Sequence, residues 1–335
     1  MKHISYIFFL LIAFVCCERI IAGILPQTKD RKISVSTSAE LKNALQNAKP
    51  GDEIILADGI YIGKFVVPAG INGSELKPIT LKGSRNAILD AGTINTGYVF
   101  HLQSSWWVLR GFSITNGLKG IIVDGANNNL IEDVKLYEIG EEGIHLRKFS
   151  SHNIISKCDI SNTGLKTADY GEGIYIGSAK NNWSKYSEGK PDLCDSNVVT
   201  QTHIGPGISA ECIDIKEGTT GTVIRNNFFD AAGITGANSA DSWIDVKGNN
   251  CLIENNTATN PGNNIFRDGY QVHCAVNGWG NNNEFKGNVS TVNAAGYGFS
   301  IQLSGSNGTT LGNKVYSNNT VNGAASGIAN IPLSN

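Results

Sequence analysis

Acidic and basic side chains recur in the same order at two places in the chain. Glu211, Asp214 and Lys216 lie within one short segment, and Asp245 and Lys247 repeat the order of the last two. Carboxylate oxygens can hold a hard cation such as Ca²⁺, and a lysine beside them can carry a proton or neutralise an anion. A carboxylated sugar chain with a bridging cation requires such mixed charges. These residues are therefore the first candidates for chemistry.

The charged residues lie inside a phrase that recurs along the chain, with the form x-Gly-apolar-x-apolar-x. Its main copies begin at Lys119, Glu142, Glu172, Glu211, Ser242, Asp268 and Tyr297. Weaker copies begin at Tyr98 and Ser326. Apolar and variable positions alternate within each copy, which is the periodicity of a β-strand. A second phrase, which begins with Asn and carries apolar residues, follows most copies, so each repeat predicts at least two short strands separated by turns.

Repeats of strands without intervening helices predict an all-β solenoid. Gly contributes 39 of the 335 residues, and Gly and Asn both suit the tight corners of coils because they tolerate positive φ. We therefore predict a single right-handed parallel β-helix of about ten coils, with further early strands at 53–56 and 79–82. Loops of different length would explain the variable spacing of the phrases.

The open end of a solenoid exposes strand edges and core, so it requires a cap. Thr37 and Glu40 have the spacing of a capping box, and apolar residues follow at helical spacing from Leu41. We predict an N-terminal capping helix near residues 38–48.

In such a solenoid the x positions point outward, and stacked coils arrange them in three columns. Neighbours in a column lie about 4.8 Å apart. The first column reads Lys119, Glu142, Glu172, Glu211, Ser242, Asp268 and Tyr297. The second reads Ile122, His145, Tyr175, Asp214, Asp245, Gln271 and Ser300. The third reads Asp124, Arg147, Gly177, Lys216, Lys247, His273 and Gln302.

Three segments near the N-terminus resemble the opening of pectin-lyase-like β-helix proteins: residues 38–45, 49–61 and 77–83. In outline the chain is most similar to polysaccharide lyase family six, the alginate and dermatan lyases, over roughly residues 33–331. The resemblance implies that Glu211 is a calcium ligand and Lys216 the catalytic base. The chain departs from the family at Ser209, where the family has a second Glu, and it lacks the family's Arg-His-Gly motif.

From these columns and this resemblance we expect a polysaccharide lyase that cleaves a uronate-containing glycan by Ca²⁺-assisted β-elimination. The base needs a pKa lowered by nearby cations and burial. The expected metal ligands are Glu211, Asp214, Asp245 and Asp241. The expected catalytic groups are Lys216 as base, Lys247 and Arg267 as neutralisers of the uronate, and His145 and His273 as neutralisers or acids. The expected substrate-binding residues are Arg147, Tyr175, Gln271, Trp243 and Trp279.

Two other functions remain open at this point. Asp214 and Asp245, one coil apart, could be the two carboxyls of a glycoside hydrolase. The chain could also be a non-catalytic glycan-binding surface protein, in which the charges pair fully with one another. A further possibility is that the charged columns are plain surface salt bridges, each worth less than about 1 kcal/mol.

The first residues have the pattern of a secretory signal, with Lys2 and His3 before an apolar run. We expect residues 1–23 to be a signal peptide and residues 24–335 to be the β-helix domain of a secreted glycoprotein. The run is too short to span a membrane, and no later segment could do so. Acceptor triplets for N-glycosylation begin at Asn72, Asn182, Asn255, Asn288, Asn307 and Asn318.

The remaining partners follow from charge and cysteine content. The net charge is −2, which gives no indication of a nucleic-acid partner. We expect an acidic polysaccharide as the partner and a monomer as the working form. Five cysteines remain after the signal, so at least one is unpaired within the chain. Cys194 and Cys212 could bridge across one coil, or all five could be buried free thiols.

Overall fold

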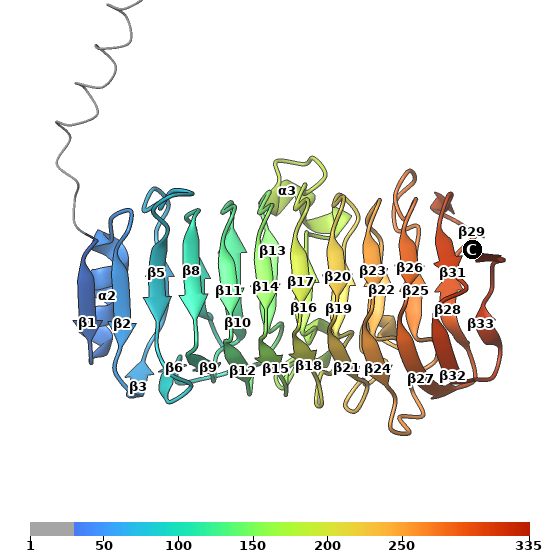
Figure 1. Cartoon of the computed structure of the whole chain (residues 1–335), viewed down its shortest axis with the longest axis horizontal. Coiled ribbons are helices and arrows are strands. Elements are labelled where there is room, and N and C mark those ends of the chain that lie inside the picture. The colour runs from blue at the N-terminus through green and yellow to red at the C-terminus, as the bar shows by residue number, and fades with distance from the viewer. Residues whose placement is uncertain (1–29) are drawn as a thin grey trace, which may run out of the picture. The chain divides into compact units, whose positions relative to one another are not determined.

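Three parallel β-sheets wind around one apolar core in the computed structural model, which describes residues 30–335 (Figure 1). Residues Lys32–Asn335 form one compact unit. The unit is the predicted right-handed parallel β-helix, and its coils follow one another along the long axis. The predicted signal peptide, residues 1–23, lies outside the described residues. In the part of the chain that is described, no helix has the length and apolar character needed to cross a membrane.

Sheet A contains twelve strands in sequence order. They are β1 (Lys32–Val35), β2 (Glu53–Leu56), β5 (Ile79–Lys82), β8 (Trp107–Arg110), β11 (Leu130–Glu132), β14 (Ile154–Ser156), β17 (Val198–Thr200), β20 (Val223–Arg225), β23 (Leu252–Glu254), β26 (Glu284–Lys286), β31 (Lys314–Tyr316) and β34 (Leu333–Ser334). The early strands predicted at 53–56 and 79–82 are confirmed.

Sheet B contains ten strands. They are β3 (Gly59–Ile62), β6 (Ala87–Asp90), β9 (Ser113–Thr115), β12 (Lys135–Tyr137), β15 (Asp159–Ile160), β18 (His203–Ile204), β21 (Phe228–Asp230), β24 (Thr257–Thr259), β27 (Val289–Ala294) and β32 (Thr320–Ala324).

Sheet C contains the recurring phrase and also has ten strands. They are β4 (Phe65–Val67), β7 (Tyr98–Leu102), β10 (Lys119–Asp124), β13 (Ile144–Arg147), β16 (Ile174–Ile176), β19 (Ile213–Ile215), β22 (Ile244–Val246), β25 (Tyr270–Val272), β28 (Tyr297–Ile301) and β33 (Gly327–Ala329). Every copy of the phrase, including the two weak ones, therefore supplies a strand to one sheet.

Short elements decorate the loops between the sheets. They are the antiparallel pair β29 (Ser304–Gly305) and β30 (Gly308–Thr309), the 3-10 turns at Ala168–Tyr170, Lys180–Asn182 and Ala237–Ser239, and the helix α3 (Trp183–Tyr186). Helix α3 lies in a long loop that projects from the middle of the solenoid (Figure 1).

The predicted cap is confirmed as helix α2 (Ser38–Asn47), which lies at the N-terminal end of the solenoid (Figure 1). The hydroxyl of Thr37 accepts a hydrogen bond from the Glu40 amide at 3.2 Å, and the Glu40 carboxylate accepts one from the Thr37 amide at 3.1 Å. Leu41 and Leu45 are fully buried. The capping box thus fixes the start of the helix, while its apolar face covers the first coil.

The core consists of columns of inward side chains in register. In sheet A one such column is Ile131, Ile155, Val199, Ile224, Ile253 and Phe285, and all six are fully buried. In sheet C the matching column is Ile144, Ile174, Ile213, Ile244, Tyr270 and Phe299. Because each apolar residue contacts its equivalents in the neighbouring coils, the repeat in sequence becomes a continuous core.

Buried asparagines form a ladder at the corner between sheets A and B. The rungs are Asn227, Asn256, Asn288 and Asn319, and each of the first three donates its side-chain amide to the next side-chain carbonyl at 3.0 Å. Each ladder carbonyl also accepts the backbone amide of the preceding rung, as Asn256 does from Asn227 at 3.0 Å. Asn226 and Asn255, which precede two rungs, take the predicted left-handed conformation. The sequence predicted the corner role of asparagine but not this second, buried role.

The asparagine ladder also determines whether one of the predicted acceptor asparagines can be glycosylated. Asn288 is fully buried and donates to Asn319 and to a backbone carbonyl, so it cannot carry a glycan in the folded protein. The other predicted acceptors are exposed: Asn72, Asn182, Asn255, Asn307 and Asn318.

All five described cysteines are free and buried, which excludes the predicted Cys194–Cys212 bridge in this structure. Burial raises the pKa of the Cys158 and Cys251 thiols to about 12. The five thiols therefore act as small apolar side chains, as the second alternative had it.

We predict that Asn256→Ala lowers the free energy of unfolding by about 3 kcal/mol, because it leaves the buried backbone amide of Asn227 without its acceptor and removes one of the two acceptors of the Asn227 side-chain amide. Thr257→Ala, at an exposed neighbour, should change it by less than about 0.5 kcal/mol. Denaturant unfolding of the two variants measures both values. Equal effects would show that the ladder adds no more than an ordinary surface residue.

Candidate active site

The outward face of sheet C carries the middle predicted column in the expected register. Asp214 in β19 pairs with Tyr175 in β16 on one side and with Asp245 in β22 on the other. Gln271 and Ser300 continue the middle column in β25 and β28. Residues that are far apart in sequence therefore lie on adjacent rungs.

A network of ion pairs occupies the middle of this face. The Lys216 ammonium lies 2.5 Å from an Asp214 carboxylate oxygen. The Lys247 ammonium bridges the two rungs, at 2.9 Å from Asp214 and 2.5 Å from Asp245. The His273 ring nitrogen Nδ1 lies 2.7 Å from the other Asp245 oxygen. Two carboxylates and two ammonium groups thus neutralise one another, with His273 at the edge.

These contacts set the protonation states. Burial opposes the charge on Asp245, but Lys247 and His273 outweigh it and hold the pKa of this carboxyl well below its usual range. Burial likewise opposes the charge on both lysines, but Asp214 and its neighbours raise the pKa of Lys216 and of Lys247 above the ordinary value. The Asp245 charge raises the pKa of His273. The lowered pKa expected for Lys216 is therefore wrong for the protein alone, because its carboxylate partner is too close.

Beside this network lies a buried acidic triad, Glu172, Glu211 and Asp214. One oxygen from each residue lies within 4.8 Å of the others. Burial and the neighbouring carboxylates raise the pKa of Glu172 well above its ordinary value and that of Glu211 to about 8. The Glu172 oxygen Oε2 is buried and has no hydrogen-bond partner in the described part of the chain. The triad is therefore short of positive charge.

Glu172 was not among the predicted site residues, although it stands in the first column directly before Glu211. The signal that could have revealed it is the register itself. Of the predicted metal ligands, Glu211 and Asp214 belong to the triad, whereas Asp245 and Asp241 do not. Asp245 is occupied by Lys247 and His273. The prediction of these two as ligands is not supported by the geometry.

Tyr175 lies next to the triad and to Lys216. The Lys216 ammonium is 4.8 Å from the centre of its ring, and the His145 ring stacks edge-on at 4.4 Å. Burial and the Asp214 charge raise the pKa of Tyr175, so its hydroxyl remains protonated at neutral pH. The ring is partly exposed on the face. Tyr175 therefore presents a proton donor between the acidic triad and solvent.

His145 is buried beneath this group. Its Nε2 lies 3.0 Å from the Gly177 carbonyl, and its Nδ1 is 3.5 Å from Glu142. Burial lowers the pKa of His145, although Glu142 opposes the change. Glu142 is itself paired with Lys119 and Glu142's pKa is lowered to about 2. His145 is thus a neutral ring that supports Tyr175, and its predicted contact with substrate would require movement.

Three predicted substrate-binding residues are engaged inside the protein instead. Trp243 is fully buried, packs on Phe266 and Tyr270 and donates to the Thr259 carbonyl. It occupies the glycine position of the phrase, which points inward at the corner, and Gly269 in the next coil leaves room for its ring. The prediction for Trp243 is therefore wrong.

Arg147 is also buried, and its prediction as a substrate contact is wrong. Its guanidinium binds both oxygens of Asp124, at 2.6 and 3.2 Å, and donates to the Tyr98 hydroxyl at 3.0 Å. Tyr186 of helix α3 covers it, with the ring centre 4.3 Å from the guanidinium carbon. His101 lies 2.9 Å from the same carboxylate. The loop that contains helix α3 therefore covers the face at Arg147.

Gln271 is buried and donates to Asp241 at 2.7 Å and to Asp268 at 3.2 Å. Its amide is therefore committed to the protein, and Asp241 acts as its acceptor. Trp279 is half-buried in the loop after β25, and its role in substrate binding stays a prediction. Arg267 is largely exposed and stands at the opposite end of its strand from the lysines.

The pair needed by a hydrolase is not available. A glycosidase requires one carboxylic acid that can donate a proton. Asp214 and Asp245 share Lys247, and the pKa of Asp245 is depressed, so Asp245 stays ionised. Asp214 in turn lies between the Lys216 and Lys247 ammonium groups, so both carboxyls are paired with cations and neither is the free acid that this alternative needs.

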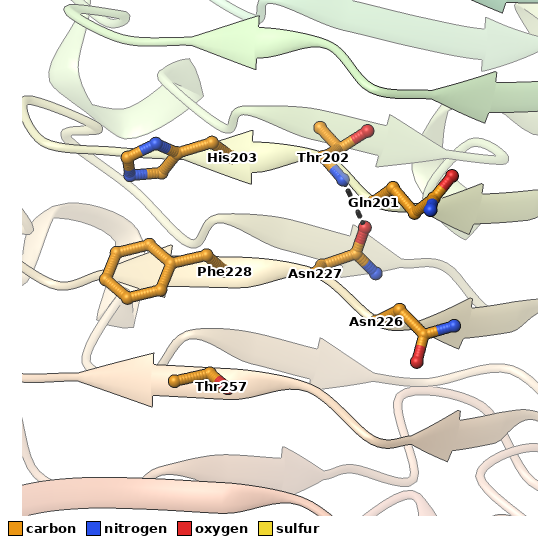
Figure 2. A pocket seen from close by; sticks show the side chains of 7 residues that line it. All are labelled: Gln201, Thr202, His203, Asn226, Asn227, Phe228 and Thr257. Atoms are coloured by element: carbon orange, nitrogen blue, oxygen red, sulfur yellow. Dashed lines mark hydrogen bonds between the residues drawn. The ribbon is translucent and has the colours of Figure 1, made fainter.

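A separate shallow hollow lies on the outer face of sheet B. Figure 2 shows His203, Phe228 and Thr257 on successive strands, with the Thr202 amide bound to Asn227. His203 is the one titratable side chain among the residues that line it. The hollow lacks the grouped acids and bases that the charged face of sheet C carries, so that face is the candidate active site.

Comparison with known proteins agrees with this fold. Residues 26–178 match the family model described as Pel9A-like, right handed beta helix region. The crystal structure of pectate lyase Pel9A covers 89% of this chain and 80% of its own, with a TM-score of 0.62 and 16% identity, which shows the shared fold. The protein thus has the right-handed parallel β-helix fold of that pectate lyase, as the opening segments predicted.

A structure with higher identity narrows this class. The crystal structure of alginate lyase from Paenibacillus sp. str. FPU-7 is 42% identical, covers 90% of this chain and 99% of its own, and has a TM-score of 0.80. Pectate lyase L of Paenibacillus polymyxa (strain SC2) is 29% identical over 137 residues, 38% of this chain, and the match spans 30% of that protein's length. The chain belongs to the polysaccharide lyases of the parallel β-helix superfamily.

We predict that Asp124→Ala lowers the free energy of unfolding by about 3–5 kcal/mol, because it leaves the buried guanidinium of Arg147 without its counter-charge. Glu132→Ala, which removes the half-buried partner of the exposed Arg110, should cost less than about 1 kcal/mol. Denaturant unfolding compares the two. A small cost for Asp124→Ala would mean that Arg147 turns outward easily, which would restore it as a possible substrate contact.

Proposed function

We propose that this protein is a secreted, monomeric lyase that cleaves a uronate-containing polysaccharide, alginate-like or pectate-like, by β-elimination at the face around Lys216. Neither a nucleic acid nor a membrane is proposed as a partner. The observation that carries the proposal is the close grouping of Lys216, the partly exposed Tyr175 and the buried acidic triad on the outward side of sheet C. The 42% identity to an alginate lyase over nearly its whole length supports the same conclusion.

β-Elimination at a uronate has three requirements. The carboxylate must be neutralised, the neighbouring proton must be removed by a base, and the departing sugar oxygen must receive a proton. We assign the base to Lys216, whose ammonium lies beside the partly exposed ring of Tyr175. We assign the proton donor to the Tyr175 hydroxyl, since its pKa is raised. Lys247 contributes positive charge toward the bound carboxylate, and so does His273 when it is protonated.

The acidic triad fits a Ca²⁺ ion. Ca²⁺ prefers several oxygen ligands, and Glu172, Glu211 and Asp214 offer carboxylates within 4.8 Å of one another. The unpartnered oxygen of Glu172 and the raised pKa of Glu211 both indicate a place where positive charge is lacking. When bound, Ca²⁺ would neutralise the substrate carboxylate and offset the Asp214 charge that keeps Lys216 protonated. Three protein carboxylates leave positions for water or for oxygens of the substrate.

We predict that Lys216→Ala lowers the rate of unsaturated product formation by at least about a hundredfold, the usual contribution of a general base. The assay follows absorbance near 235 nm with alginate and pectate as separate substrates. Lys216→Arg should be equally inactive, because a guanidinium keeps the positive charge but cannot accept the proton.

Lys135→Ala, an exposed lysine on sheet B, is the matched control and should retain full activity. If Lys216→Arg keeps most of the activity, Lys216 supplies charge and is not the base. New reducing ends without a rise in absorbance near 235 nm would show that the protein is a hydrolase and not a lyase. Glycan binding with neither signal would favour the non-catalytic alternative.

We predict that Glu172→Gln weakens Ca²⁺ binding by at least about tenfold in calorimetry, since it removes one of three charged ligands. The same variant without Ca²⁺ should be at least as stable as the parent, because a buried, unpartnered carboxyl is removed. Glu75→Gln, at an exposed acid, should change neither property. A parent protein that shows no heat of binding with millimolar Ca²⁺, and full activity in chelator, would refute the metal assignment.

A further inference from the structure

The middle column of the charged face leads into a second hollow beyond Gln271. The next residue in this column, Ser300 of β28, lies at its floor. The hollow has a volume of about 530 Å³ and lies between the loops before β25 and β28. Its lining includes Asn264, Arg267, Asp268, Tyr297 and Ser300. The hollow therefore lies on the same sheet face as the candidate active site, further along the column that contains Asp214 and Asp245.

The Arg267 backbone is held by a hydrogen bond, whereas its guanidinium is largely exposed. Its amide donates to the Asp241 carbonyl at 2.8 Å, and the preceding Phe266 is buried against Trp243, 4.6 Å between ring centres. The Arg267 side chain is nevertheless 72% exposed. The buried indole thus anchors the loop that presents this cation to the hollow.

The neighbouring carboxylate does not satisfy Arg267. Asp268 is 3.9 Å from the guanidinium Nε, beyond hydrogen-bond distance. One Asp268 oxygen accepts the Tyr297 amide at 2.6 Å, and the other accepts the Gln271 side chain at 3.2 Å. Both oxygens of Asp268 are therefore occupied by hydrogen bonds within the wall of the hollow. The guanidinium keeps donors that match both oxygens of a carboxylate.

The position of Arg267 excludes the role first predicted for it. Strand β25 lies two rungs from β19, or about 10 Å along the axis at the usual strand spacing. Arg267 precedes β25, whereas Lys216 follows β19, so the two stand at opposite ends of their strands. A uronate held at Lys216 therefore has its carboxylate neutralised by other groups.

We infer that the Arg267 hollow is a distal subsite that binds the carboxylate of another uronate unit in the same polysaccharide chain. This inference rests on the proposed function, and it adds that the substrate runs along the solenoid axis across Gln271. Arg267 binds the carboxylate of this second uronate unit, and Tyr297 and Ser300 present hydroxyl groups to the same sugar. A chain too short to reach from Lys216 to Arg267 does not gain this contact, so the enzyme favours long chains.

The test compares a hexasaccharide and a trisaccharide prepared from alginate. In a Lys216→Ala background, which prevents turnover, Arg267→Ala should weaken hexasaccharide binding about five- to tenfold in calorimetry and leave trisaccharide binding unchanged. In the otherwise unaltered enzyme, Arg267→Ala should raise KM for the hexasaccharide by the same factor and keep kcat. Arg267→Lys keeps the charge but loses the two-pronged donor geometry of the guanidinium. Its affinity for the hexasaccharide should therefore lie between those of the parent and of Arg267→Ala.

Arg225→Ala, an exposed arginine on sheet A, is the matched control and should change neither ligand's binding. Equal losses for the two ligands, or a KM unchanged by Arg267→Ala, would overturn the subsite while leaving the lyase proposal standing. A length-dependent loss of binding without any unsaturated product would support the subsite and refute the lyase. A similar loss for an uncharged hexasaccharide would overturn the assignment of a carboxylate to Arg267.

Discussion

The in-register stacking of parallel strands is the constraint on which the rest of this structure depends. Adjacent rungs lie about 4.8 Å apart, so each residue contacts its equivalents in the coils on either side. Inside, this rule joins isoleucines such as Ile174 and Ile213 into one core. Outside, the same rule forces Asp214 and Asp245 together. A single geometric relation therefore builds both the stable part and the reactive part of the molecule.

Buried charges that lie this close together need partners of opposite sign. On the outward face of sheet C, some carboxylates have such partners and others do not. Asp214 and Asp245 are paired with Lys216 and Lys247, and Asp124 is paired with Arg147. Glu172 and Glu211 remain without such partners, and their raised pKa values record the cost of burying them. A protein gains no stability from that arrangement. The unpaired acids are better understood as the groups that a cation or a substrate completes, which is why the proposal centres on them.

Much of the face could be predicted because its signal is local and repeated. The phrase beginning at Glu211 gave the strand, its outward positions and its neighbours, and the capping helix from Ser38 followed from a short motif. The errors arose where a side chain departs from the average phrase. Trp243 occupies the inward-facing position of the phrase that glycine usually holds. Arg147 is covered by Tyr186, which lies in a loop without any repeated pattern. Repeats predict what is common to all coils and nothing about the exceptions.

The amino-acid sequence by itself determined the solenoid, its cap and the three outward columns, since period-two alternation and corner residues act within a few positions. Only the tertiary structure decided which charges are satisfied. Distances of a few ångströms separate Asp245, which is neutralised by Lys247 and His273, from Glu172, which has an unpartnered oxygen. Both are outward acids in the same pattern. Electrostatic energy depends on the separation of charges and on their burial, and neither quantity is encoded in the spacing of residues along a chain.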